Sequence, residues 1–251
     1  MANPIESPQP FTLDKGYGDK VALGLIVLAT DETLEPEIAP VIHRAGIPLY
    51  QSRISSHPDV TRETLLRMES DLPTAAGLLP TGVNFAAIGY GCTSASTIIG
   101  PQRVAVAIQT AHPDVPVTDP ITAVIAALAK LRVKRLGFVT PYIADVSAAM
   151  RQMLEHHGIE ISAFASFSQV EERVVARISE ESVLQAVQNV GQNCDAVFTS
   201  CTNLRSFNII AQAETRIGKP VISSNSALAW HMMRLAGMQG PIAGPGHLFT
   251  V

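Results

Sequence analysis

The second half of this sequence repeats the first half in outline. Segment 23–47 resembles 136–159, segment 90–94 resembles 199–203, and segment 115–131 resembles 219–235. The three pairs keep one order and nearly one offset, which indicates an internal duplication rather than a chance match. A duplicated chain predicts two similar lobes, related by a pseudo-twofold axis, with a cleft between them.

Within each repeat, short apolar runs alternate with longer amphipathic segments. The runs at 21–29, 85–90, 135–140 and 195–200, and a shorter one at 220–224, are nearly continuous and β-branched, which is typical of strands in a parallel sheet covered on both faces. The segments 35–46, 119–133, 145–158 and 179–191 have helical periodicity. The pattern predicts an α/β fold in which helices flank a parallel sheet in each lobe, joined by right-handed crossovers.

The repeat also sets approximate domain boundaries. We expect residues 1–20 to form an N-terminal arm, 21–118 plus 220–251 a first lobe, and 119–219 a second lobe. The lobes are free to exchange their terminal helices.

Charge and cysteine content narrow the functional classes. Lys and Arg number 18 against 22 Asp and Glu, a net charge of −4, and the cations are scattered, so no nucleic-acid surface is expected. No apolar stretch approaches the roughly 20 residues of a membrane span, and the N-terminal segment lacks a signal-peptide core, so no membrane partner is expected. Three cysteines in 251 residues argue against a disulfide framework and favour a cytoplasmic setting.

Two of the cysteines occupy equivalent places in the repeat. Cys92 and Cys201 each follow an apolar run and precede short hydroxyl residues. Because open α/β sheets bind ligands at the carboxyl ends of their strands, the two thiols should approach one ligand from opposite sides. A thiol reacts as its thiolate, and helix N-termini lower the thiol pKa, so we expect Thr93, Ser94 and Thr202 to begin helices that activate the cysteines and bind a carboxylate.

Opposed thiols are suited to three reactions on a small carboxylic acid. One thiolate removes a proton beside a carboxylate and the other thiol returns one on the opposite face, which inverts a stereocentre. Alternatively, a thiolate adds to an alkene, the new single bond rotates, and elimination gives the other geometric isomer. In the third reaction a cysteine protonates an enediolate after loss of CO₂. All three need donors at the carboxylate oxygens.

The third cysteine and the histidines show weaker signs of a functional role. Cys194 has no counterpart in the first repeat and is interpreted as a structural cysteine. The seven histidines show no metal-binding spacing, and His112 and His247 are the two that lie near loops. No glycine-rich nucleotide motif is present, so neither a metal nor a cofactor is expected.

Together these features resemble the aspartate/glutamate racemase superfamily, in the branch that holds maleate cis-trans isomerases and arylmalonate decarboxylases. The match is carried by GLIVLATDETLEPE, GYGCTSAS, TPYIADV, SCTNL and KPVISSNSALAWHMMRLAG, which span most of the chain. The resemblance implies Cys92 and Cys201 as the catalytic pair, and a homodimer. It also implies a set of residues that bind the substrate carboxylate: Thr93, Ser94, Tyr142 and Thr202.

Arylmalonate-type decarboxylases keep only the second cysteine, so the resemblance favours an isomerase or racemase. A decarboxylase and a non-catalytic solute-binding protein remain as alternatives. The sequence departs from the branch at Asp31, which stands where maleate isomerases typically carry an asparagine. An ionised Asp31 would repel a carboxylate, so this residue is protonated, caps the following helix, or pairs with a cationic ligand. The last alternative is consistent with a further similarity to ectoine-utilisation proteins, whose substrates would be amino- or amidine-bearing acids.

Overall fold

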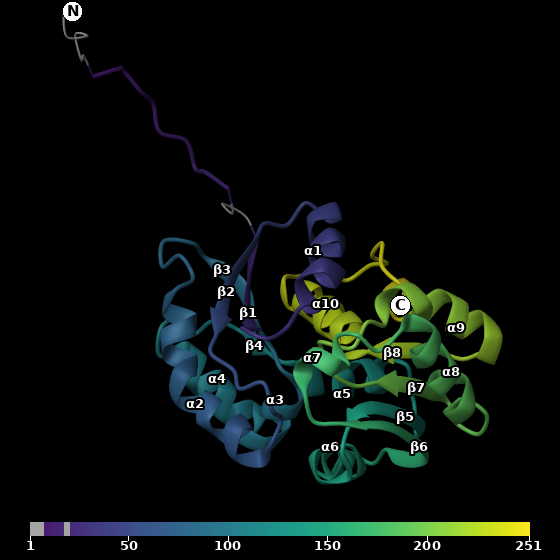
Figure 1. The fold of residues 1–251 in the computed structure, drawn as a ribbon. Helices are drawn as coiled ribbons and strands as arrows, with labels where there is room; N and C mark the ends of the chain where they lie inside the picture. The colour runs from purple at the N-terminus through teal and green to yellow at the C-terminus, as the bar shows by residue number, and fades with distance from the viewer. Residues whose placement is uncertain (1–7, 18–20) are drawn as a thin grey trace, which may run out of the picture.

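The computed structural model describes residues 8–17 and 21–251. Its strands form two separate four-stranded sheets, and every pairing within them is parallel (Figure 1). The first sheet has the order β2 (Leu49–Ile54), β1 (Ala22–Leu28), β3 (Phe85–Gly91), β4 (Val117–Thr118), and the second the order β6 (Glu160–Gln169), β5 (Arg135–Tyr142), β7 (Ala196–Thr199), β8 (Val221–Ser223). The shared order confirms the predicted α/β fold and fits two similar lobes.

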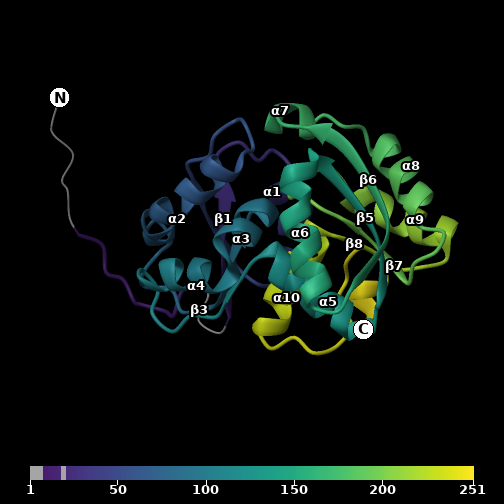
Figure 2. The same cartoon turned by 90° about the horizontal axis from the view of Figure 1, so that it is seen from below.

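Helices cover both sheets (Figure 2). The first lobe carries α1 (Leu34–Arg44), α2 (Arg62–Gly77), α3 (Thr93–Ile99) and α4 (Pro101–Gln109), and the second carries α6 (Ala144–His156), α7 (Glu172–Val175), α8 (Glu180–Val190) and α9 (Ile210–Ile217). Helices α5 (Pro120–Lys130) and α10 (Ser224–Leu235) pack against each other, and α10 also packs on β3. The core between these layers is mostly aliphatic.

The predicted strands differ from the structure at three sheet edges. The five continuous apolar runs form β1, β3, β5, β7 and β8, but β2, β4 and β6, all edge strands, were not predicted from the sequence. The outward side chains of β2 and β6 reach solvent, so polar residues interrupt the apolar pattern, and β4 has only two residues.

One lobe boundary needs correction. Residues 220–251 were assigned to the first lobe, yet β8 pairs with β7 in the second sheet, just as β4 pairs with β3 in the first. The chain crosses to the first lobe only with α10, which follows β8 directly. The other boundaries remain predictions.

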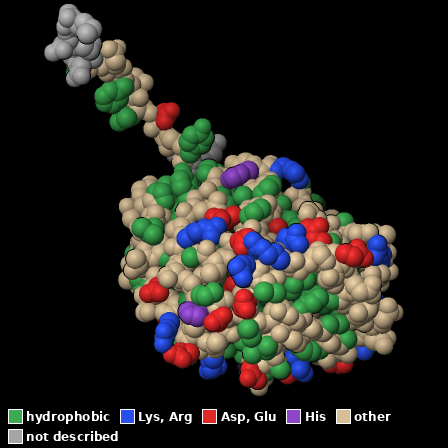
Figure 3. Space-filling model, viewed as in Figure 1, with side chains coloured by type: hydrophobic (Ala, Val, Ile, Leu, Met, Phe, Trp, Pro, Cys, Tyr) green, Lys and Arg blue, Asp and Glu red, His purple; other side chains and the backbone are tan. Residues whose placement is uncertain are grey.

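The N-terminal arm was predicted over residues 1–20. Residues 1–7 and 18–20 of it lie outside the described residues, and 8–17 contain neither helix nor strand. In the described parts of the chain, no helix combines the length and apolarity needed to cross a bilayer. The face shown in Figure 3 carries interspersed acidic and basic side chains.

Candidate active site

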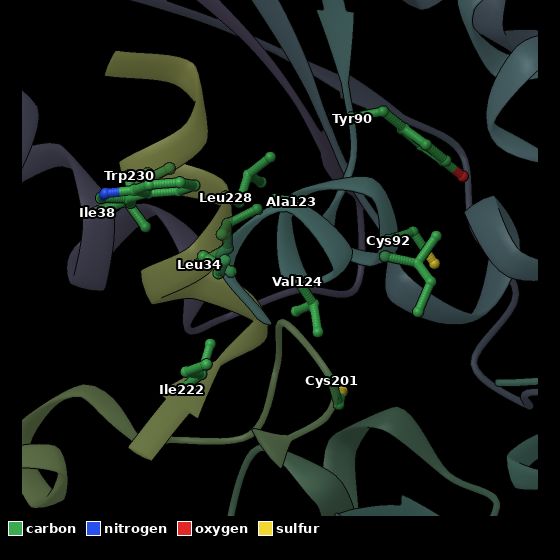
Figure 4. Close-up of a cluster of buried hydrophobic side chains, with 14 of the residues drawn as sticks. Leu34, Ile38, Tyr90, Cys92, Ala123, Val124, Cys201, Ile222, Leu228 and Trp230 are labelled. Carbon is green, nitrogen blue, oxygen red and sulfur yellow. The ribbon is translucent and has the colours of Figure 1, made fainter. Parts of the chain in front are cut away.

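Cys92 lies immediately after β3, at the N-terminus of α3. Its Sγ accepts a hydrogen bond from the backbone N–H of Ala95 at 3.3 Å. The helix predicted to begin at this corner is present, but the thiol caps it rather than a hydroxyl group. The preceding Gly91 is required by packing, because a Cβ at this position would collide with the side chain of Leu34 from α1. Figure 4 shows Cys92 and Cys201 on two separate loops among buried side chains.

Cys201 occupies a different kind of corner. It follows β7, but residues 202–206 form no helix, so the predicted helix N-terminus at Thr202 is wrong. The Cys201 φ of 97° lies in a region that non-glycine residues rarely adopt. Its Sγ accepts the N–H of Asn203 at 3.3 Å instead. A non-glycine residue with such a φ stores strain, which is found mostly at functional sites.

The two cysteine corners are joined by hydroxyl groups. The Ser224 hydroxyl accepts the N–H of Cys201 at 3.0 Å and lies 2.8 Å from the hydroxyl of Thr93. The Thr202 hydroxyl donates to the carbonyl of Gly91 at 3.3 Å. The structure therefore brings the corners of the two lobes into direct contact, as the duplication predicted, but it occupies two of the predicted carboxylate donors.

Ser94 is the exception among these donors. Its side chain is only 2% exposed and lines a small cavity beside Cys92, and its Oγ has no hydrogen-bond partner. A buried polar atom without a partner is unfavourable, so this hydroxyl is available to a ligand.

Tyr142, at the end of β5, reaches both a thiol and a carboxyl group. Its hydroxyl lies 3.0 Å from Cys201 Sγ and donates to Glu172 Oε1 at 2.6 Å. Glu172 belongs to α7, is 4% exposed, and accepts a second bond at its Oε2 from Asn203 Nδ2 at 2.9 Å. The sequence analysis missed Glu172 because a glutamate in the segment QVEERVV carries no signal that separates it from a solvated surface charge.

Asp31 lies in the loop between β1 and α1. Its Oδ1 accepts the N–H groups of Thr33 and Leu34, both at 2.8 Å, which is the helix-capping alternative left open above. Its Oδ2 is buried and has no hydrogen-bond partner. The same loop is tied to the Cys201 corner, because Glu32 N–H donates to Asn203 Oδ1 at 2.9 Å.

The site carries several acidic groups at close quarters. Burial raises the pKa of the Cys92 thiol to about 12; the N–H of Ala95 acts to lower this pKa, and the nearby Glu172 and Asp31 carboxyl groups act to raise it. Burial, with Glu172 again adding to it, places the pKa of Cys201 well above its ordinary value. Burial also raises the pKa values of Asp31 and Glu172. The expected activation of the thiols by helix N-termini is therefore wrong for the resting protein.

The cavity between the lobes is nearly closed. Its volume is about 20 Å³, and its lining includes Cys92, Ser94, Tyr142 and Glu172. That is room for a single water molecule, since about 10–15 Å³ of such volume holds one. Two segments close it, because the backbone at 58–60 pairs with the backbone at 170–172. A substrate of several heavy atoms must therefore separate these segments to enter.

The remaining candidates lie outside this cluster. His112 bonds to the carbonyl of Ala76 at 3.0 Å, and His247 lies 3.2 Å from the Thr250 hydroxyl. Cys194 is buried in the core, as its structural interpretation predicted. Over residues 8–17 and 21–251, no three His, Cys, Asp or Glu side chains are grouped to hold a metal ion.

Comparison with known proteins decides the family. A family model described as arylmalonate decarboxylase matches residues 86–249, which contain both cysteine corners. The chain belongs to the arylmalonate decarboxylase family. This confirms the branch that the sequence motifs indicated.

Relatives in this family carry two activities in their names. Maleate isomerase from Alcaligenes faecalis is 24% identical over 243 residues, covering 91% of this chain and 96% of that protein. Arylmalonate decarboxylase from Bordetella bronchiseptica is 30% identical over 135 residues, covering 53% of this chain and 56% of that protein. The chain is thus a member of a family of isomerases and decarboxylases.

Solved structures of the relatives share the fold. A cysteine-to-alanine variant of the maleate isomerase Iso from Pseudomonas putida S16, with maleate, has a TM-score of 0.84 at 23% identity and covers 92% of this chain and 97% of that one. A cysteine-to-serine variant of maleate cis-trans isomerase from Nocardia farcinica, with a covalently bound succinylcysteine intermediate, has a TM-score of 0.83 at 23% identity, covering 91% and 98%.

Proposed function

We propose that this chain is a cofactor-independent isomerase or racemase acting on a small carboxylic acid, with Cys92 and Cys201 as its catalytic pair. The observation that carries the proposal is the joining of the two cysteine corners through Ser224. Cys92 lines the cavity, and Cys201 contacts the hydroxyl of Tyr142, which lines it too. The succinylcysteine intermediate named for the Nocardia relative supports covalent cysteine chemistry within this fold.

Each thiol has one task in either form of the reaction. In cis-trans isomerisation, a thiolate forms a C–S bond to one alkene carbon while the π electrons move toward the carboxylate. Rotation about the resulting single bond and breakage of the C–S bond then release the other isomer. In racemisation, a thiolate takes the proton beside the carboxylate and the opposite thiol supplies one on the other face. Burial raises the pKa of both thiols, so each is protonated at rest and is able to donate a proton.

The substrate carboxylate needs hydrogen-bond donors, and Ser94 is the first of them. Its unpartnered hydroxyl lines the cavity, whereas the hydroxyls of Thr93 and Thr202 already hold the corners together. Thr93 and Thr202 would therefore support the site rather than contact the ligand. Tyr142 would have to release Glu172 to donate to a carboxylate.

Two carboxyl groups favour a substrate that also carries a cation. Asp31 Oδ2 lacks a partner, and Glu172 lines the cavity. A maleate-like dicarboxylate would bring two negative charges beside them, which is unfavourable in a poorly solvated site. An amino- or amidine-bearing acid, such as an acid derived from ectoine or hydroxyectoine, would pair its cation with Asp31.

The test uses solvent deuterium and two variants. Wild type, Cys92→Ser and Cys201→Ser are assayed in D₂O against maleate, aspartate and amino- or amidine-bearing acids, with product geometry, stereochemistry and deuterium content read by NMR. We expect conversion by the wild type and a loss of at least about 100-fold in each variant. Full turnover in both variants would refute the mechanism.

Arylmalonate-type decarboxylation is the second candidate, because the matching family model carries that name. It predicts release of CO₂ from a malonate derivative and tolerance of Cys92→Gly, since that chemistry needs one cysteine. Tight ligand binding without any conversion would instead indicate a non-catalytic solute-binding protein.

The assembly and setting are proposed on the resemblance and composition alone. We propose a homodimer in the cytoplasm. Sedimentation velocity on the purified chain distinguishes a dimer from a monomer, and fractionation of the source cells tests the location.

A further inference from the structure

Cys201, Tyr142 and Glu172 form a chain of two hydrogen bonds. Cys201 Sγ, Tyr142 Oη and Glu172 Oε1 are linked at 3.0 Å and 2.6 Å, and all three residues are buried. The tyrosine has one hydroxyl proton, and it is donated to Glu172. The Cys201 sulfur already accepts the N–H of Asn203, so its own proton is free to donate to Tyr142 Oη.

The same chain of hydrogen bonds is compatible with a second arrangement of protons. If Glu172 holds a proton, it donates to Tyr142 Oη, and the tyrosine hydroxyl donates to a Cys201 thiolate. No heavy atom has to move between the two arrangements. The 2.6 Å contact is typical of a hydrogen bond to an ionised carboxylate, which is the resting arrangement.

We propose that Glu172 is the proton acceptor that converts Cys201 to its thiolate, through the hydroxyl of Tyr142. The Cys201 S–H bond breaks as its proton passes to Tyr142 Oη, while the Tyr142 O–H proton passes to Glu172 Oε1. The result is a thiolate, a neutral tyrosine and a protonated Glu172, so the total charge is unchanged. This inference rests on the proposed function, because it explains how one of the paired thiols becomes reactive inside a closed site.

This proton transfer from Cys201 through Tyr142 to Glu172, called the relay below, makes the two thiols unequal in reactivity. Cys92 Sγ has the N–H of Ala95 as its hydrogen-bond partner, and no base is linked to it by the hydrogen bonds of the described residues. In racemisation, Cys201 would therefore act as the base and Cys92 as the proton donor on the opposite face. A carboxylate next to a buried thiol would otherwise only hinder its ionisation, because like charges repel.

Asn203 holds the acceptor in place. Its Nδ2 donates to Glu172 Oε2 at 2.9 Å and to the Glu172 carbonyl at 3.1 Å. Asn203 thus holds both the carboxylate and the backbone carbonyl of Glu172, which keeps Glu172 Oε1 directed at Tyr142. The titratable groups that line the cavity with Glu172 are Tyr142, Cys92, His57 and Asp59. Cys201 and Asp31 are outside this lining but interact electrostatically with Glu172.

The experiment measures the reactivity of each thiol without any substrate. Wild type, Glu172→Gln and Tyr142→Phe are alkylated with iodoacetamide from pH 5 to 9, and peptide mass spectrometry gives separate rates for Cys201 and Cys92. Cys92 lines the same cavity, so its rate reports how often the site opens in variants that keep the charge of Glu172. In Glu172→Gln the Cys92 pKa changes as well, so there the Cys201 rate itself is the readout. Glu171→Gln is the matched control, because it removes the same charge from the adjacent, exposed side chain.

We expect each of the two relay variants to lower the Cys201 rate by at least about tenfold relative to the wild type at pH 7, within the range of general-base effects. In the wild type, the Cys201 rate should fall as the pH drops through the raised pKa of Glu172, and this step should vanish in Glu172→Gln. Glu171→Gln should match the wild type. Circular dichroism confirms that each variant is folded.

A purely electrostatic role gives the opposite sign. Removing the charge of Glu172 would then lower the pKa of both thiols, so an unchanged or increased Cys201 rate in Glu172→Gln would overturn the relay. Tyr142→Phe also removes a hydrogen bond that lowers the Cys201 pKa, so a lowered rate in this variant supports the relay only together with a lowered rate in Glu172→Gln. Turnover on the substrate panel separates the two proposals: a lowered Cys201 rate in a chain without turnover supports the relay and refutes the isomerase, whereas turnover with an unchanged Cys201 rate does the reverse.

Discussion

The hydroxyl groups of Thr93 and Ser224 lie 2.8 Å apart, and through them the two halves of a duplicated chain meet beside their cysteines. Ser224 also accepts the N–H of Cys201, so one small side chain fixes both corners. This arrangement explains why neither cysteine corner can be displaced without affecting the other.

Ser224→Ala tests that link. The change leaves the buried N–H of Cys201 without its partner, so we expect the free energy of unfolding to fall by about 1–3 kcal/mol. Urea denaturation followed by circular dichroism measures it. Ser70→Ala, at an exposed serine in α2, should stay within about 0.5 kcal/mol of the wild type. Equal stability in both variants would contradict the link.

Ser94→Ala should separate stability from function. The Ser94 hydroxyl has no partner in the folded protein, so its removal should leave the free energy of unfolding unchanged or slightly increased. If the hydroxyl binds the substrate carboxylate, KM should rise by about tenfold, which corresponds to one lost hydrogen bond of about 1.4 kcal/mol. Denaturation and steady-state kinetics on one preparation check both statements. A clear loss of stability would mean that the hydroxyl has a structural partner.

Cys201→Gly and Cys201→Ala should differ in stability. The Cys201 φ of 97° is costly for alanine and free of strain for glycine, so we expect the glycine variant to be more stable by about 1 kcal/mol or more. At Cys92, φ is −147°, and glycine should be no better than alanine. Thermal denaturation of the four variants gives the comparison. The same order at both positions would show that the backbone of Cys201 relaxes without cost.

Glu37 should give the stability a pH dependence. Its carboxyl group accepts the N–H groups of Ser206 and Phe207, and burial raises its pKa from 4.5 to about 7. Between these two values the folded chain binds a proton that the unfolded chain has lost, so the free energy of unfolding should fall as the pH rises from 4.5 to about 7. Urea denaturation across this window should show a weaker decline in Glu37→Gln than in the wild type. Parallel curves would exclude Glu37 as the cause.

Arg177→Ala should make the cavity easier to open. The Arg177 guanidinium forms an ion pair with Glu32 across the two lobes, at 2.8 and 2.9 Å. Exposed pairs of this kind contribute little to stability, so alkylation of Cys92 should become faster by a small factor, at most about fivefold. Arg67→Ala is the control, since that arginine pairs with Glu63 within α2. A faster rate in the control as well would show that the effect is not specific to the lobe contact.

The sequence determined the fold class, the two sheets and the placing of Cys92 and Cys201. These follow from local apolar patterns and from an internal duplication, and both features are visible in the linear sequence. The resemblance to the racemase superfamily also identified Tyr142 as a site residue. It showed that Asp31 stands where maleate isomerases typically carry an asparagine. Each of these statements needs only neighbouring residues, or the knowledge that parallel strands end at a common edge.

Tertiary structure alone decided the role of Glu172 and the state of the thiols. Glu172 meets Tyr142 and Asn203 only because three segments distant in sequence fold around one cavity. The backbone strain at Cys201 and the raised thiol pKa likewise come from burial, which is a property of the assembled core. Desolvation depends on what surrounds a group in space, and a linear sequence does not state that.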